Sequence, residues 1–405
     1  MQVFQCFCDF CRSTELNLCY VPSESERDSR VFVCELCGLI QSQWSTAYTS
    51  RPRVATISSG ANWGNIRHGK RLRLDDNLRF IQSHLADPIR VASVLDIGSN
   101  RGHFMKAAPY IFPNASEVLG IEPDAHVIDW CRADVRQRVI HGRLEDISLT
   151  NNHFDFVFSS HTLEHSRSAR EMLKQTYDCM SPGGLHFLEV PNIENLNDRD
   201  IVEEFFIDKH SFHFDRELLV RFLRAAGFDV IAGENSGDCY NVTLLLRKAE
   251  RESFGDLSSI ASPTRAQEHK LLIADYAERL SANRSLLKRV AGEIERLAQG
   301  ARVALWGGGR IFDALVRFGG LDTQKVMYVV DTFIGSYLPR CHGLDIVLPN
   351  ALATDRPDCV VVLARSSAEP ILATLETAHV PKVVLFSDIL QGMRDAGEDK
   401  ALPVL

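Results

Sequence analysis

The sequence has no long hydrophobic run and no excess of positive charge. No apolar stretch approaches the roughly 18 residues that a membrane-spanning helix needs, so we expect no membrane partner. The formal net charge of −8 disfavours a nucleic-acid partner, because phosphate backbones are bound by clustered lysine and arginine. The first ten residues lack the basic and apolar sections of a signal peptide, and we therefore expect a cytoplasmic protein.

Cysteine is sparse over most of the chain but concentrated at its start, where six of the 11 cysteines fall within residues 1–37. Without an export signal, a disulfide framework is disfavoured. Two Cys-x-x-Cys pairs separated by 22 residues have the spacing of a tetrahedral zinc site, and so short a segment could hardly bury a core without one. The predicted ligands of a structural Zn²⁺ are Cys8, Cys11, Cys34 and Cys37. Cys6 and Cys19 are left outside this set, although Cys6 could compete with Cys8.

A glycine-punctuated turn follows an apolar strand at residues 94–102 (VLDIGSNRG). Gly98 and Gly102 allow a sharp turn and a close approach of a ligand to the backbone. Glu122 ends the next apolar strand, where a carboxylate can accept hydrogen bonds from both ribose hydroxyls. Because Asn100 interrupts the dinucleotide pattern, a ligand with adenosine but without phosphates fits better. The alternative is an ordinary strand-to-helix turn.

Later segments extend this α/β pattern. Asp146 follows a third short apolar stretch and is placed near an adenine edge. Residues 154–161 form a predicted central strand with polar residues at its carboxyl end, where ligands bind in open α/β sheets. Residues 181–191 give a further strand after a Ser-Pro-Gly-Gly turn.

Residues 75–245 resemble, as a set, the Rossmann-like class of S-adenosylmethionine (SAM)-dependent methyltransferases. The resemblance implies SAM as cofactor, with Glu122 binding its ribose and Asp146 its adenine. Asp96, Gly98 and Gly102 would hold the methionine end, and His161 would lie on the cofactor side after the fourth strand.

The fold class expected is α/β, with a Rossmann-like methyltransferase core between two further parts. We predict a zinc-binding module at residues 1–50, the methyltransferase core at 51–250, a linker helix at 264–300 and a C-terminal Rossmann-like domain at 301–405. The linker shows an apolar period typical of a helix.

The C-terminal domain begins with a strand that runs into Gly307-Gly308-Gly309, with Asp331 at the end of the next strand. This arrangement could bind a nucleotide. The alternative, which the absence of the dinucleotide spacing favours, is that the glycines only shape the turn.

The order of these parts resembles the sugar C-methyltransferases. The residues that carry this resemblance are 33–41 in the zinc module, and 330–339 and 344–349 in the closing domain. Such enzymes methylate C3 of nucleotide-linked 4-keto-deoxysugars. The resemblance therefore implies a sugar or sugar-nucleotide acceptor.

The family places a histidine after the fourth strand and a Tyr-x-Glu-His cluster after the fifth. His165 matches the first and His210 the second, but Ile207 and Lys209 stand at the tyrosine and glutamate positions. His213 is a third candidate for acid–base catalysis. The alternative for His210 and His213 is a buried pair that packs under the fifth strand.

We therefore expect SAM-dependent methyl transfer to a sugar or nucleotide-linked sugar. An O- or N-methyltransferase on another small metabolite is the first alternative, because it needs fewer polar groups than C-methylation. A scaffold protein with a degenerate acceptor site is the second. The methylated atom, the nucleotide carrier, the identity of the base and the oligomeric state stay open.

Overall fold

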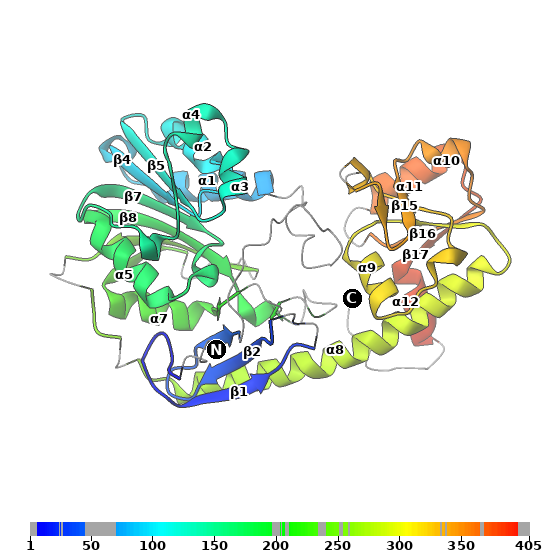
Figure 1. The fold of residues 1–405 in the computed structure, drawn as a ribbon, viewed down its shortest axis with the longest axis horizontal. Coiled ribbons are helices and arrows are strands. Elements are labelled where there is room, and N and C mark those ends of the chain that lie inside the picture. The colour runs from blue at the N-terminus through cyan, green and yellow to red at the C-terminus, as the bar shows by residue number, and fades with distance from the viewer. Residues whose placement is uncertain are drawn as a thin grey trace. The chain divides into compact units, whose positions relative to one another are not determined.

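The computed structural model describes residues 6–23, 25, 27–44, 70–196, 203, 205–206, 210–233, 240–250, 254–257, 260–332, 334–336, 338–364 and 368–395. The chain divides into two compact units (Figure 1). The first unit comprises residues 1–50, 69–196 and 205–275, and the second comprises residues 51–68, 197–204 and 276–405. The predicted zinc module thus shares a unit with the predicted core, and the domain boundaries stay predictions.

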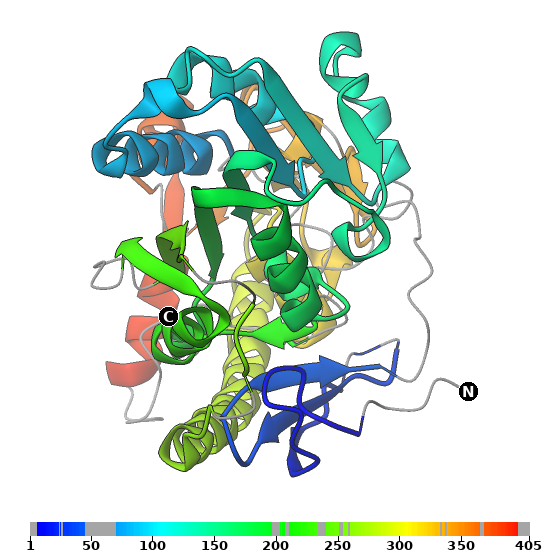
Figure 2. The same ribbon diagram turned by 90° about the vertical axis from the view of Figure 1, so that its left-hand side faces the viewer.

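A seven-stranded sheet in the order β10-β11-β8-β7-β4-β5-β6 forms the centre of the first unit (Figures 1 and 2). Its strands are β4 (Ser93–Ile97), β5 (Glu117–Glu122), β6 (Val139–His141), β7 (Phe154–Ser160), β8 (Met180–Pro191), β10 (Phe228–Ala232) and β11 (Asn241–Lys248). Strands β4 to β8 run parallel, and β11 and β10 add antiparallel pairs. The central strand β4 is buried throughout, as expected for a parallel strand covered on both faces. The predicted Rossmann-like sheet is confirmed.

Helices cover both faces of this sheet. They are α1 (Lys70–His84), α2 (His103–Ile111), α3 (Ala125–Asp129), α4 (Ala133–Arg136), α5 (Ala169–Cys179) and α7 (Arg216–Ala226), with 3₁₀ helices η2 (Pro88–Arg90), η3 (Leu144–Asp146), η4 (Leu163–His165) and η5 (Ile193–Asn195). Ser168 caps α5 by accepting a hydrogen bond from the Glu171 amide. Asp215 caps α7, which ends at Gly227 in the left-handed region. One core cluster contains residues of α5 and α7, and another contains residues of α1 and α2.

A second, four-stranded sheet joins the N-terminal segment to the core. It has the order β1-β2-β3-β9, with β1 (Leu16–Tyr20), β2 (Arg30–Cys34), β3 (Ile40–Gln43) and β9 (Phe212–His213). Strand β9 lies more than 160 residues after β3 in the chain, and it pairs antiparallel with β3. Phe10 stacks on Phe222 of α7, so the N-terminal segment also packs on the core through its aromatic side chains.

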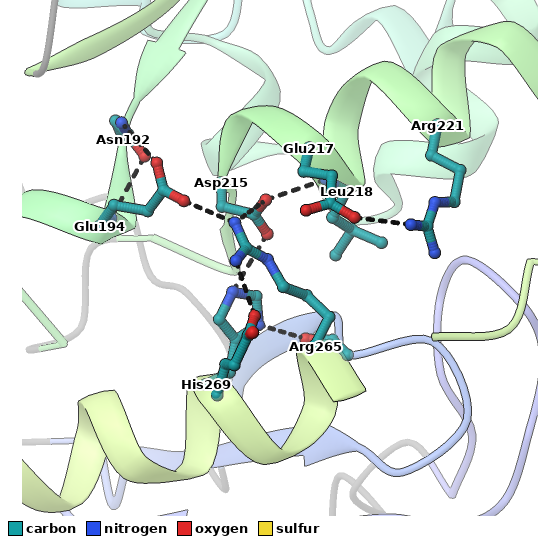
Figure 3. A network of polar contacts seen from close by, with 10 residues as sticks. Asn192, Glu194, Asp215, Glu217, Leu218, Arg221, Arg265 and His269 are labelled. Carbon is teal, nitrogen blue, oxygen red and sulfur yellow. Dashed lines mark hydrogen bonds and ion pairs between the residues drawn. The ribbon is translucent and has the colours of Figure 1, made fainter. Parts of the chain in front are cut away.

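A buried ion network fixes the start of α8 (Pro263–Ala298) to α7 and to the N-terminal segment (Figure 3). Arg265 lies 2.8 Å from one oxygen of Asp215, and His269 lies 3.1 Å from the other. The second ring nitrogen of His269 is 2.7 Å from the carbonyl oxygen of Gly38. Burial alone would raise the pKa of Asp215, but the hydrogen bonds and charges of His269 and Arg265 hold that pKa well below its usual range.

The second unit contains a six-stranded sheet in the order β14-β15-β13-β12-β16-β17. Its elements are β12 (Val303–Trp306), α9 (Arg310–Arg317), η6 (Thr323–Lys325), β13 (Val329–Val330), η7 (Ile334–Ser336), β14 (Arg340–Cys341), β15 (Leu344–Val347), α10 (Ala351–Thr354), β16 (Cys359–Val362), α11 (Ala368–Thr377), β17 (Lys382–Leu385) and α12 (Phe386–Asp395). All strand pairs are parallel except β14 with β15, which confirms a second Rossmann-like sheet.

The glycine turn of this second sheet is closed by Asp331. One carboxylate oxygen accepts a hydrogen bond from the Gly308 amide, and the other accepts one from the Ile334 amide. Asp331 therefore has a structural task that needs no nucleotide. Among the described residues, no helix combines the length and hydropathy needed to cross a membrane.

We predict that Asp215→Ala lowers the free energy of unfolding by about 3–5 kcal/mol, because it removes the carboxylate that faces the buried ring of His269 and one of the three carboxylates around Arg265. Asp229→Ala is the control, since its pair with Arg247 is half exposed and is worth about 0–1 kcal/mol. Urea unfolding of both variants measures the difference. Because the pKa of Asp215 is depressed, its stabilisation should persist above pH 4 and disappear as the pH falls through the native pKa. Equal unfolding midpoints for the two variants would contradict the assignment.

Candidate functional site

The first part of the site is the turn after β4. Gly98 and Gly102 have φ of +76° and +68°, in the left-handed region that favours glycine. A Cβ at Gly98 would lie 2.3 Å from the hydroxyl of Thr162, so the turn packs directly against the segment that follows β7. The Gly98 and Ser99 amides both donate to the carbonyl oxygen of Ile121, which ties the turn to β5.

Glu122 lies at the end of β5 beside this turn. One carboxylate oxygen accepts a hydrogen bond of 2.8 Å from the Asn100 amide, and the other accepts one of 2.9 Å from the Asp124 amide. These bonds fix the carboxylate, and a carboxylate oxygen can accept more than one hydrogen bond. The position of Glu122 is therefore compatible with the predicted ribose contact.

Asp96 is the innermost acidic residue of the turn, with a side chain that is 2% exposed. Among the described residues, none donates a hydrogen bond to the carboxylate of Asp96, and none forms an ion pair with this carboxylate. Burial, and to a lesser degree the charge of Glu122, raises the pKa of Asp96 well above its ordinary value. A buried carboxylate without a counter-ion favours a cationic ligand, which would lower that pKa again.

Asp146 lies in η3, directly after β6. Its carboxylate is half exposed and pairs with Arg167. The neighbouring Glu145 accepts a hydrogen bond from the Arg167 amide. The structure thus places Asp146 near the carboxyl ends of the strands, where adenine recognition was predicted, and that role stays a prediction.

His161 follows β7 and has φ of +52°, in the left-handed region that few residues other than glycine adopt. Its amide donates to the Glu189 carbonyl oxygen of β8. Its Nδ1 lies 3.4 Å from a carboxylate oxygen of Glu164, and its Nε2 lies 3.8 Å from one of Glu189. The imidazole is therefore held between two buried carboxylates.

His165 and His210 are brought together, as the family resemblance at the two positions implies. Their rings lie 4.7 Å apart in an edge-to-face arrangement, and His210 is only 8% exposed. The Ser211 amide donates to the Glu164 carbonyl oxygen, which fixes the segment of His210 against η4. The two residues, 45 positions apart in sequence, thus form one polar cluster with Glu164.

His213 lies in β9 and is 2% exposed. Its Nε2 is 2.8 Å from the hydroxyl of Ser42 in β3, and burial together with the charge of His165 lowers the pKa of His213 to about 3. A neutral, hydrogen-bonded imidazole suits a structural role, and a catalytic role for His213 stays a prediction. Ile207 and Lys209 lie outside the described residues.

The four predicted zinc ligands form one buried cluster. Their sulfur atoms all lie within 4.8 Å of one another, and the Cys8–Cys37 and Cys11–Cys34 pairs are each 3.5 Å apart. Zinc–sulfur bonds of about 2.3 Å in a tetrahedron give sulfur separations of about 3.8 Å, so the cluster is compatible with a zinc ion. Cys6 is exposed and lies outside the cluster.

Sequence reasoning did not identify Glu164 and Glu189 as part of this site. Both are almost fully buried, and both face His161. Each carboxylate occurs at or just beyond the carboxyl end of a parallel strand, which is the signal that could have identified it.

Two domain families match the chain. Residues 66–232 match a methyltransferase domain, and residues 261–383 match a C-methyltransferase C-terminal domain. The fold and these two matches are those of the class I methyltransferases, which depend on SAM. More particularly, this chain contains a methyltransferase domain followed by a C-terminal domain of the C-methyltransferase type.

A curated relative is the tRNA U34 carboxymethyltransferase of Syntrophotalea carbinolica, which is 32% identical over 117 residues. The match covers 27% of this chain, and the chain spans about a third (35%) of the length of that relative. Solved structures that are similar include a protein from Pyrococcus horikoshii (17% identity, TM-score 0.39, 50% of this chain and 100% of that one). A SAM-dependent methyltransferase from Archaeoglobus fulgidus is also similar (19% identity, TM-score 0.35, 44% and 95%).

We predict that Glu122→Gln weakens SAM binding about 10- to 100-fold, because the amide loses a charge-assisted acceptor for the ribose hydroxyls. Calorimetric titration with SAM measures the effect. Glu117→Gln, at the opposite and exposed end of β5, is the control and should bind like the wild type. Equal affinity of the Glu122 and Glu117 variants would contradict the ribose assignment.

Proposed function

We propose that this protein transfers a methyl group from SAM to a carbon atom next to the ketone of a nucleotide-linked sugar. The observation that carries this proposal is the C-methyltransferase C-terminal domain at residues 261–383. The cluster of Glu164, His165 and His210 beside the glycine turn supports it, because carbon methylation needs a group that removes a proton.

The cofactor would be held by the turn after β4. Asp96 would face the positive charge of the methionine end, Glu122 the ribose hydroxyls and Asp146 the adenine. When bound, SAM supplies an electrophilic methyl group on a sulfonium and leaves as S-adenosylhomocysteine. The buried and unbalanced charge of Asp96 is the feature of this chain that fits such a cation.

The acceptor would lie against the histidine cluster. An imidazole of the cluster takes the proton from the carbon next to the ketone, and the electron pair of that C–H bond moves into the enolate. The new C–C bond then forms as the S–C bond breaks, so no oxidant or reductant is needed. Exclusion of water by Phe205, which lies 5.8 Å from the His210 ring, would favour proton transfer inside the site.

We further propose that the four-cysteine cluster binds a structural zinc ion. Four thiolate ligands leave no open coordination position, so this ion would stabilise the N-terminal fold and would not contact the substrate.

Cys34→Ser is expected to lower the zinc content by one equivalent per chain, measured by elemental mass spectrometry after desalting. Cys6→Ser is the matched control and should keep the zinc content of the wild type, since Cys6 lies outside the cluster. The zinc proposal fails if Cys34→Ser and the wild type contain the same amount of zinc.

The principal alternative is an O- or N-methyltransferase on another small metabolite. The carboxymethyltransferase relative acts on tRNA by its name, but the net charge of −8 disfavours an RNA acceptor for this chain. A non-catalytic scaffold would need a degenerate cofactor site, whereas the turn of Gly98 and Gly102 and the fixed carboxylate of Glu122 are intact.

The proposed function is tested by incubation with SAM and a panel of nucleotide-linked keto- and amino-sugars, with products followed by mass spectrometry and NMR. We expect a product that gains one methyl group on carbon. A methyl group on oxygen or nitrogen would establish the alternative instead. No product from any sugar, despite SAM binding, would overturn the sugar proposal.

We predict that His210→Ala lowers turnover about 10²- to 10⁴-fold while SAM affinity stays within a factor of about three, because His210 lies on the acceptor side. The exposed His84 at the end of α1 provides the control, and His84→Ala should retain both values. Full turnover by His210→Ala would remove His210 from the mechanism.

A further inference from the structure

Glu164 is a buried carboxylate to which the proposed methyl transfer assigns no role. Its side chain is 1% exposed, and no contact with good hydrogen-bond geometry reaches either carboxylate oxygen in the described part of the chain. The rings of His161 and His165 approach one of these oxygens, at 3.4 and 3.8 Å. Burying a carboxylate without hydrogen bonds costs several kcal/mol, and such groups are usually paired with a cation or bound to a metal. A group of this kind calls for a ligand.

Two imidazoles face the same carboxylate. The ligating atoms of Glu164, His165 and His210 all lie within 4.8 Å of one another, and His165 Nε2 is 3.8 Å from a Glu164 oxygen. Metal–ligand bonds of about 2.1 Å in a tetrahedron place neighbouring ligand atoms about 3.4 Å apart. Small side-chain rotations would therefore bring the three groups onto one ion.

We propose that Glu164, His165 and His210 form a second metal site, which binds a divalent transition ion such as Zn²⁺, Fe²⁺ or Mn²⁺. Two imidazoles and one carboxylate are a donor set that these ions accept, and three protein ligands leave positions open for an acceptor molecule. This openness distinguishes the site from the four-cysteine cluster. His161, at 3.4 Å from Glu164, would orient the liganding carboxylate from behind.

The ion would act on the ketone of the acceptor, so this inference rests on the proposed function. A divalent ion that coordinates the ketone oxygen stabilises the enolate as a Lewis acid. With His165 and His210 as ligands, the proton that the proposed function assigns to an imidazole of the cluster would pass instead to His161. This residue lies outside the cluster, between Glu164 and Glu189.

The site lies next to the cofactor turn. Thr162, between His161 and η4, packs against Gly98 and donates a hydrogen bond to the Ile97 carbonyl oxygen. An acceptor bound to the ion would therefore lie close to the region predicted to hold the methionine end of SAM.

The test is a metal titration of the full-length protein with Co²⁺, without SAM or any acceptor. The wild type is stripped with a chelator and reloaded, and bound cobalt is counted by elemental mass spectrometry and followed by visible absorption. Glu164→Gln and His165→Ala are compared with the control His84→Ala. His165 is 32% exposed, so its truncation should leave the fold intact, as circular dichroism and SAM titration would verify.

We expect two cobalt ions per wild-type or His84→Ala chain, one with thiolate charge-transfer bands and one without. Glu164→Gln and His165→Ala should lose the second ion and keep the first. The inference is overturned if all four proteins bind a single ion. It is equally overturned if a second ion is bound but survives both substitutions, because that ion would then lie elsewhere.

The metal-site proposal and the proposed function can be refuted separately by these measurements. A second ion that requires Glu164 and His165, together with no methylated sugar, would leave the metal site in place and remove the proposed function. A methylated sugar formed by a protein with only the cysteine-bound ion would retain the proposed function and remove the metal site.

Discussion

The pairing of β3 with β9 is the constraint on which the acceptor side of the site depends. Strand β3 follows the second cysteine pair, and only Ser211 separates His210 from the start of β9. The Ser42 amide donates to the Ser211 carbonyl oxygen, and the Ser211 amide donates to the Glu164 carbonyl oxygen. A continuous chain of backbone hydrogen bonds therefore connects the N-terminal sheet to the segment that carries Glu164 and His165. The N-terminal segment thus supports the segments that would form the proposed acceptor site.

In both Rossmann-like sheets, a carboxylate at the end of a strand binds backbone amides of or near the glycine turn. The two turns differ in whether an acidic side chain is left without a counter-ion. In the first unit, Glu122 accepts two backbone amides and lies beside Asp96, a buried acid with no counter-ion among the described residues. In the second unit, Asp331 accepts two backbone amides and closes the Gly308 turn. The first turn thus contains a charge that a cationic ligand would stabilise, whereas the second is satisfied by its own backbone. This difference favours the first turn as the cofactor site.

Much of this architecture follows from local sequence patterns. The apolar strands, the glycine turns and the paired cysteines are each encoded within a few residues, so both Rossmann-like sheets and the cysteine cluster could be predicted. The partner of β3 could not be predicted, because β9 has two residues and lies far away in the chain. His213 shows the same limit: its pattern is that of a candidate base, and only the contact with Ser42 reveals a neutral, buried ring. Glu164 was missed because its burial depends on η4, β9 and the core together.

Hydrogen–deuterium exchange with and without zinc tests most directly whether the N-terminal segment holds the acceptor site. When the cysteine-bound ion is lost through Cys34→Ser, which leaves Glu164, His165 and His210 unchanged, we predict faster exchange of the amides in residues 40–43 and 211–214. The amides of β4 and β5, which belong to the cofactor side, should keep their protection. If residues 211–214 stay protected in the Cys34→Ser protein, the N-terminal segment does not position His210, and the proposed acceptor site is formed without it.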